Sequence, residues 1–138
     1  VNKIDIIKFD EIATSEEKVA SEFITFLSKH FSKDNKAIMV GQNIAFDKGF
    51  IENFLESLKD KSMLWEYRRL TSYKSIDLMT ITSFLNMAGI ISTEGVSLDS
   101  LIKVLNIVIN PDERHTAKGD VLLTIEAIKR LIGLMKGE

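Results

Sequence analysis

Three residues near two predicted helix starts have the types and spacing of a hydrolytic site that uses metal ions. Asp47 follows the apolar run 37–41, and His115 stands five residues before Asp120. Carboxylate oxygens are the ligands that hard divalent cations prefer. A histidine titrates near neutral pH, so it can take a proton from a metal-bound water. Together the three side chains predict metal-assisted hydrolysis of a phosphodiester.

Each of these residues also has a simpler interpretation. Asp47 lies in the first turn of a predicted helix, where the helix dipole favours a carboxylate. His115 and Asp120, taken alone, describe a loop histidine beside a solvated helix acid. A plain helical scaffold would place that pair far from Asp47 in space. The residues by themselves leave these alternatives open.

The composition bounds the class of protein. The chain has 138 residues, 45% hydrophobic and 28% charged, which predicts one globular domain over residues 1–138. The absence of cysteine excludes disulfides and thiolate metal sites and favours a cytoplasmic location. No apolar run reaches about 18 residues, so we expect no membrane span. A net charge of −2 excludes a strongly basic nucleic-acid coat, but an acidic enzyme can hold nucleic acid through metal ions.

Hydrophobic periodicity predicts strands at residues 4–9 and 37–41, and several helices. The first helix is expected from Thr14 to about Lys29, with Thr14 and Glu17 at capping-box spacing. Residues 61–74 are expected to be loop with part of a helix. The predicted inward faces are Val19, Phe23, Phe26 and Leu27 in the first helix, Phe50, Ile51, Phe54, Leu55 and Leu58 in the second, and Ala117, Val121, Ile125, Ile128 and Ile132 in the last.

The later part of the chain is predicted to be mainly helical. The stretch that begins at Ser75 is expected to be a short strand end followed by a helix over 77–88, which is capped by Asp77 and stopped by Gly89. Ser97 caps a short helix, and the last helix runs from about Thr116 to Met135. The order of elements indicates an α/β layered domain. A sheet of only two or three strands would be too small for several amphipathic helices to pack on. Val1 also begins inside an extended stretch. We therefore expect strands upstream to be missing.

Two stretches resemble the motifs of a known family. Residues 41–51, GQNIAFDKGFI, resemble the second motif of the DEDDh 3′–5′ exonucleases, which include the proofreading subunit of bacterial DNA polymerase III, ribonuclease T and oligoribonuclease. Residues 114–120, RHTAKGD, resemble the third motif, His-x-Ala-x-x-Asp. SIDLMTIT (75–82) and SLDSLIKVLNI (97–107) resemble the connecting segments. The resemblance covers roughly residues 14–135, with both motifs in order about 70 residues apart.

The resemblance implies a ribonuclease H-like α/β fold and a role for each matching residue. Asp47 resembles the second-motif acid that supports a metal ion, and Asp120 resembles the third-motif metal ligand. His115 resembles the general base that deprotonates the attacking water. Asn43 and Phe46 match positions that shape the substrate cleft. The family uses two Mg²⁺ or Mn²⁺ ions to release nucleoside monophosphates from single-stranded 3′ ends of DNA or RNA, and a DNA polymerase is an implied partner.

The sequence departs from the family at the first motif, Asp-x-Glu, whose two acids bridge both metals. Asp10 and Glu11 are adjacent, so on a strand their side chains point to opposite faces, and Ile12 stands where the glutamate is needed. The 37 positions from Asp10 to Asp47 also leave little room for the family's three-stranded meander and helix.

We therefore interpret the chain as the C-terminal three-quarters of an exonuclease domain, without its N-terminal strands and both bridging acids. Little or no nuclease activity is expected from these 138 residues alone. The alternative is a non-catalytic module, derived from the same fold, that binds nucleic acid or a protein. Retention of Asp47, His115 and Asp120 speaks against that alternative, because a binding module needs no general base.

Overall fold

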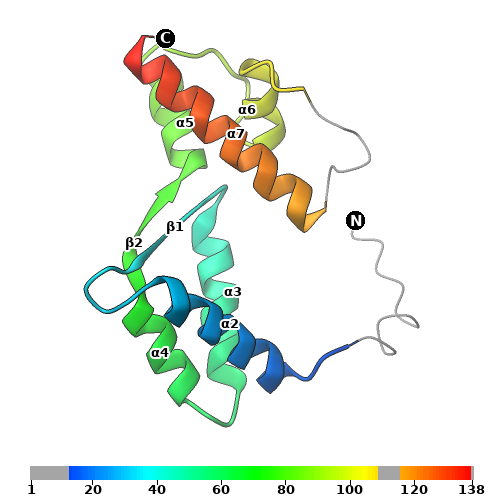
Figure 1. Cartoon of the computed structure of the whole chain (residues 1–138). Coiled ribbons are helices and arrows are strands. Elements are labelled where there is room, and N and C mark those ends of the chain that lie inside the picture. The colour runs from blue at the N-terminus through cyan, green and yellow to red at the C-terminus, as the bar shows by residue number, and fades with distance from the viewer. Residues whose placement is uncertain (1–12, 109–115, 138) are drawn as a thin grey trace. The chain divides into compact units, whose positions relative to one another are not determined.

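The computed structural model describes residues 13–108 and 116–137, which form a mixed α/β structure (Figure 1). Its two strands pair in one small parallel sheet. The predicted α/β class is confirmed, whereas the ribonuclease H-like topology stays a prediction. The predicted strand at 4–9 lies outside the described residues. The elements are α2 (Glu16–His30), β1 (Ala37–Gly41), α3 (Ile44–Ser57), α4 (Ser62–Leu70), β2 (Thr71–Asp77), α5 (Leu78–Met87), α6 (Leu98–Val104) and α7 (Ala117–Lys136).

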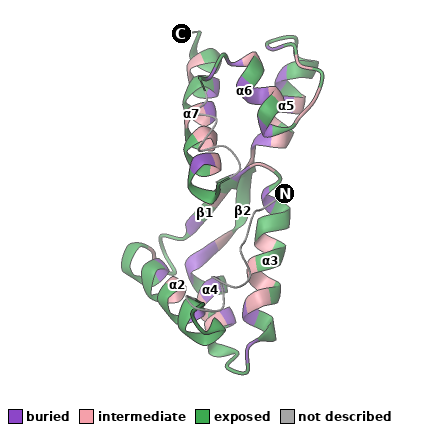
Figure 2. Ribbon diagram, turned by 90° about the vertical axis from the view of Figure 1, so that its right-hand side faces the viewer, coloured by how far each residue is buried: buried purple, intermediate pink, exposed green. Residues whose placement is uncertain are grey.

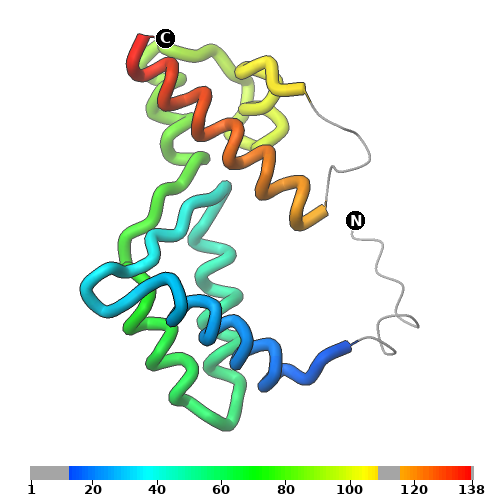
Figure 3. Tube along the Cα trace, viewed as in Figure 1, coloured from blue at the N-terminus to red at the C-terminus, as the bar shows by residue number. Residues whose placement is uncertain are grey.

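The chain divides into two compact units. The first unit holds the described residues up to Met39 together with Ala45–Ser75, and the second holds Val40–Ile44 and the described residues from Ile76 onward. Both strands begin in the first unit and end in the second, as the continuous trace in Figure 3 lets the reader follow. Because the chain passes repeatedly between the units, this division does not decide whether residues 1–138 form a single domain.

The core of the first unit lies between α2, α3 and α4 (Figure 2). Tyr67 is its largest fully buried side chain, and the Tyr67 hydroxyl contacts the Met39 sulfur at 3.3 Å. Burial raises the pKa of the Tyr67 phenol, because the phenolate would lose its hydration there. The buried members of this core are Ala20, Leu27, Leu55, Leu58, Leu64, Tyr67 and Leu70.

The cap of helix α2 lies one residue after the predicted cap, Thr14. The Ser15 hydroxyl, rather than Thr14, accepts a hydrogen bond from the Lys18 amide. The predicted inward face is correct at Leu27 but wrong at Val19 and Phe26, which are 44% and 56% exposed. The buried stripe instead runs from Ala20 to Leu27, a spacing of seven residues that returns to the same side of a helix.

The prediction of loop with part of a helix over 61–74 is correct about the helix, which is α4, and wrong about the loop, since most of β2 follows α4 directly. Leu64, Tyr67 and Leu70 recur at helical spacing and are all buried. The Asp60 carboxylate accepts from the Ser62 amide at 2.8 Å where α4 begins. Strand β2 lacks a clear apolar alternation, because most of its side chains face solvent, and so only its end, from Ser75, was predicted as a strand.

Three helices enclose the core of the second unit, and their starts agree with the sequence predictions. Asp77 caps α5, Ser97 caps α6 and Thr116 caps α7. Gly89, with φ 68°, follows the end of α5 in a left-handed conformation that glycine adopts readily. The buried members of this core are Leu78, Leu85, Ile91, Leu98, Leu101, Ile102, Leu105, Ile107, Ala127 and Leu131.

The predicted inward face of α7 is mostly wrong. Ala127 and Leu131 are buried and Ile128 is partly buried, whereas Val121, Ile125 and Ile132 are 57%, 43% and 43% exposed. Apolar residues lie on more than one side of this helix, so periodicity alone does not select the packed side. No helix in the described ranges is both long enough and apolar enough to cross a membrane.

Candidate active site

The turn between β1 and α3 positions Asp47. Gly41 ends β1 in a buried position, where a Cβ atom would lie 2.9 Å from the Ile44 Cδ1 atom. A larger residue would therefore displace the end of the Ile44 side chain, in the first residue of α3. Asn43 follows with φ 57°, in the left-handed region that asparagine tolerates better than most residues. This abrupt turn allows α3 to begin immediately after the strand.

Two hydrogen bonds from the turn reach residues far along the chain. The Asn43 amide donates to the Asp77 Oδ1 atom at 2.9 Å. The Gln42 side-chain amide donates to the Val96 carbonyl. The Gln42 Oε1 atom is buried without a hydrogen-bond partner among the described residues. The turn is therefore held by the segments around Asp77 and Val96, and not by its own sequence alone.

Asp47 lies in the first turn of α3 and is exposed. It forms no hydrogen bond or ion pair with any other residue that the structure describes. The neighbouring cation, Lys48, instead donates to the carbonyls of Ser72 at 3.4 Å and Tyr73 at 3.1 Å. The Asp47 carboxylate is thus available to a ligand, and its location in the first turn favours negative charge.

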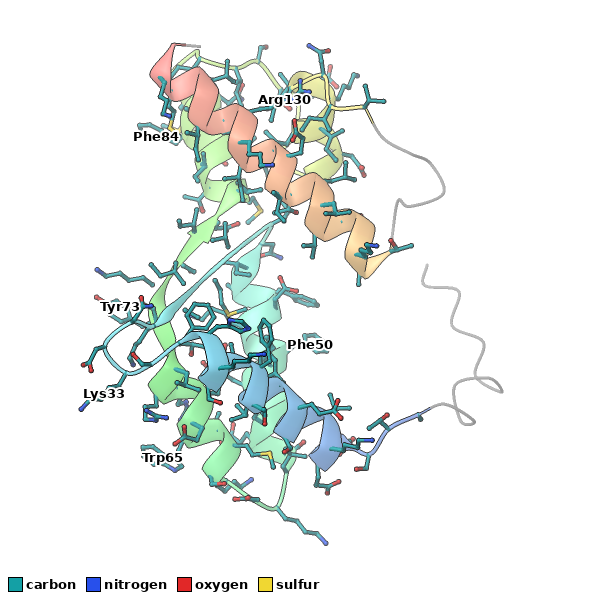
Figure 4. All side chains as sticks on the ribbon, viewed as in Figure 1. Lys33, Phe50, Trp65, Tyr73, Phe84 and Arg130 are labelled. Atoms are coloured by element: carbon teal, nitrogen blue, oxygen red, sulfur yellow. The ribbon has the colours of Figure 1, made fainter. Side chains whose placement is uncertain are left out.

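Two aromatic side chains flank Asp47 on α3. Phe46 and Phe50 are 62% and 64% exposed, and their ring centroids lie 4.8 Å apart. Figure 4 labels Phe50, whose predicted place on the inward face of α3 is wrong. Exposed aromatic rings can stack on nucleic-acid bases. The predicted substrate-shaping role of Phe46 and Asn43, both exposed, stays a prediction.

Asp120 lies in the first turn of α7, and its position is set locally. The Thr116 hydroxyl accepts from the Gly119 amide at 3.0 Å, and the Asp120 amide donates to the Thr116 carbonyl at 2.9 Å. Asp120 itself is half-buried. His115, the predicted general base, lies outside the described residues, so its role stays a prediction.

Carboxylates suit Mg²⁺ or Mn²⁺, yet the described donors make an incomplete set. Asp47 belongs to the first unit and Asp120 to the second. Over residues 13–108 and 116–137, no three His, Cys, Asp or Glu side chains are grouped so that they could hold a metal ion. Two carboxylates would supply part of the oxygen shell that such an ion takes. The metal-ligand roles of Asp47 and Asp120 stay predictions.

The aromatic and basic cluster at 67–69 has structural partners. Tyr67 is buried in the core of the first unit. Arg68 pairs with Glu52 at 3.3 Å, and Arg69 pairs with Glu66 at 2.7 Å. The Arg69 guanidinium hydrogen-bonds to Glu66 and lowers the pKa of that carboxyl. These contacts favour a solvated, paired face over a surface for a phosphate backbone.

Asp77 is the residue whose contribution the sequence reveals only in part. Its place before an apolar helix predicts a helix cap, and this is confirmed by the bond from the Met79 amide at 3.1 Å. Its second bond, from Asn43, joins residues 34 positions apart and has no sequence signal. The sequence pattern likewise predicts no structural role for Lys48.

A comparison with known proteins agrees with the resemblance seen in the motifs. A protein of Rhodobacter capsulatus named DNA polymerase III subunit epsilon-like protein is 35% identical over 101 residues, which is 72% of this chain. The chain spans only 12% of that protein's length. No family model matches the sequence, and no solved structure gives a significant match. A distant homologue of this chain is thus named for the epsilon subunit of DNA polymerase III.

Proposed function

We propose that this chain carries the second and third motifs of a DEDDh 3′–5′ exonuclease that acts on single-stranded 3′ ends of DNA or RNA. One observation carries the proposal: the 35% identity to an epsilon-like protein covers 72% of a chain in which both motifs occur in the family's order. Further support comes from the Asp47 carboxylate, which is exposed in the first turn of α3 and has no partner among the residues that the structure describes.

The proposal assigns one task to each site residue. Asp47 and Asp120 are ligands of Mg²⁺ or Mn²⁺, and His115 accepts the proton of the attacking water. Asn43 and Phe46 border the cleft that receives the terminal nucleotide. The bound ions supply positive charge for the attacking and leaving oxygens. By the name of the relative, association with a DNA polymerase belongs to the same proposal.

The 138 residues contain no Asp-x-Glu sequence, and this shapes what the proposal expects. Asp47 and Asp120 alone should bind Mn²⁺ weakly and support little or no hydrolysis. A longer gene product that contains an upstream Asp-x-Glu should be active. The missing motif is also what favours the second candidate, a non-catalytic module that binds nucleic acid or protein.

The test begins with the intact mass and N-terminal sequence of the natural protein. The natural protein and the 138-residue chain are then incubated with 5′-labelled single-stranded DNA and RNA in Mg²⁺ or Mn²⁺. The proposal expects a ladder of products shortened from the 3′ end, lost in His115→Ala and Asp120→Asn, for a natural protein that contains Asp-x-Glu. Binding of the oligonucleotides without shortening by such a protein would replace the exonuclease with the binding module.

A further inference from the structure

We propose that Asp77 is a positioning residue that fixes the turn from which Asp47 is presented. This inference rests on the proposed function, because it concerns the same candidate metal ligand. It adds a task to a residue whose sequence context indicates a helix cap only. The argument starts from the atoms that the Asp77 carboxylate contacts.

One oxygen of Asp77 serves two segments of the backbone. The Asp77 Oδ1 atom accepts from the Met79 amide at 3.1 Å and from the Asn43 amide at 2.9 Å. The second oxygen, Oδ2, lies 3.4 Å from the Thr80 hydroxyl. A helix cap needs only the local bond. The shorter bond to Asn43 therefore has a separate consequence, which is to join the start of α5 to the start of α3.

The Asn43 amide lies where the main chain changes direction. The residue is exposed and stands in a left-handed conformation between β1 and α3, where the main chain leaves the strand and has not yet entered the helix. A hydrogen bond to a charged acceptor is stronger than one between neutral groups. The Asp77 carboxylate thus stabilises the turn in the conformation described.

Asp47 follows Asn43 by four residues, about one helical turn. The direction of its carboxylate therefore depends on the conformation of the turn. Lys48, the next residue, also anchors this helical turn by donating to the carbonyls of Ser72 and Tyr73 in β2. Strand β2 thus contacts the start of α3 through Lys48 and, at its last residue, through Asp77.

The decisive variant is Asp77→Ser. Serine is as good a helix cap as aspartate, so α5 should persist. Its hydroxyl is one bond shorter and should not reach Asn43. Asp77→Asn keeps a carbonyl oxygen at the same distance and should rescue the turn. Asp60→Ser is the matched control, because Asp60 also accepts from an amide at a helix start but its bond to Ser62 is local.

Two readouts on the 138-residue protein separate this inference from the proposed function. Amide hydrogen exchange reports on the bond itself: in Asp77→Ser the Asn43 amide should exchange about tenfold faster, while the Met79 amide changes little. Mn²⁺ titration followed by line broadening of α3 amides reports on the candidate ligand. Its apparent affinity near Asp47 should fall about tenfold in Asp77→Ser and remain unchanged in Asp60→Ser and Asp77→Asn.

The outcomes differ for the two claims. Unchanged exchange of the Asn43 amide in Asp77→Ser would overturn the inference whatever Mn²⁺ does. Faster exchange with unchanged Mn²⁺ affinity would reduce Asp77 to a structural residue and overturn its positioning role. If the wild-type protein shows no broadening near Asp47, the proposed metal-binding role of Asp47 is wrong, and the exchange result alone then decides whether Asp77 fixes the turn.

Discussion

Two helix starts, that of α7 before Asp120 and that of α3 before Asp47, are held in different ways, although the residues that hold them belong to the same second unit. Thr116 caps α7 through a bond to Gly119, three residues away. The turn that leads to Asp47 depends on Asp77, 34 residues beyond Asn43, and on Val96. The local arrangement can be read from a short stretch of sequence, whereas the long-range one cannot. Asp47 and Asp120 therefore occupy similar positions in their helices, but the position of Asp47 requires a much longer part of the chain to fold.

The largest effect should come from substitutions that each destabilise one of the two cores. Leu55 in the first unit and Leu101 in the second are both fully buried, so substitution of either by alanine should cost about 2–5 kcal/mol. Hydrogen exchange should show loss of protection in α2, α3 and α4 for Leu55→Ala, and in α5, α6 and α7 for Leu101→Ala. Leu122→Ala, at a position 49% exposed, is the control. Equal loss across all helices in both variants would mean that the units unfold as one.

The next effect concerns the left-handed residue before α3. Alanine at position 43 meets a steric cost of roughly 1–2 kcal/mol that glycine avoids. Asn43→Ala should therefore lower the free energy of unfolding by about that amount, and Asn43→Gly should not. Asn106, with φ 52° in the second unit, is a matched site for the same pair of substitutions. Denaturant titration checks both, and an Asn43→Ala protein as stable as Asn43→Gly would argue against the turn described.

A smaller effect is expected at the start of α7. Thr116→Ala removes the side-chain acceptor of the Gly119 amide and should destabilise the helix by about 1 kcal/mol. Thr116→Ser retains a hydroxyl and should behave as wild type. The change should remain at the start of α7, with faster exchange at Gly119 and no change at Asn43. If Asn43 also exchanges faster, the contrast between a local and a long-range helix start does not hold.

The smallest effect is the response of stability to alkaline pH. It should distinguish the two units, because both tyrosines, Tyr67 and Tyr73, belong to the first unit. The folded-state pKa of Tyr67 is raised above its usual 10.0 by burial. Its contribution to stability is therefore complete below about pH 10 and is lost as the pH rises through the raised value. The first unit should lose hydrogen-exchange protection over that range. Tyr67→Phe should remove this dependence, and Tyr73→Phe, at an 87% exposed position, should not.

Local signals predicted much of the fold. Strand β1 and the caps at Asp77 and Ser97 were predicted because each depends on a few consecutive residues. The packed face of α7 was not, because that helix carries apolar residues on several sides and only tertiary contacts choose among them. Only the end of strand β2 was predicted, and its earlier residues were missed for a related reason, since pairing with β1 rather than its own apolar pattern makes them a strand.

In the candidate site, too, local features were predicted from the sequence and long-range contacts were not. The first-turn locations of Asp47 and Asp120 agree with the sequence, because a helix start is a local feature. The bond between Asn43 and Asp77 could not be foreseen, since nothing in either segment indicates the other. Whether Asp47, His115 and Asp120 act together depends on long-range geometry of that second kind and stays a prediction.

The contact between Met39 and Tyr67 makes methionine oxidation a probe of packing in the first unit. Methionine sulfur is readily oxidised to the sulfoxide when an oxidant reaches it. Met87 and Met135, 87% and 59% exposed, should react at once, whereas Met39 packs against the core and its sulfur meets the Tyr67 hydroxyl. Met39 is partly buried, so its sulfoxide should accumulate more slowly than at Met87 and Met135, and faster when that core is loosened. The methionines thus place fast and slow oxidation sites in one chain, and their ratio responds to the packing of the first unit.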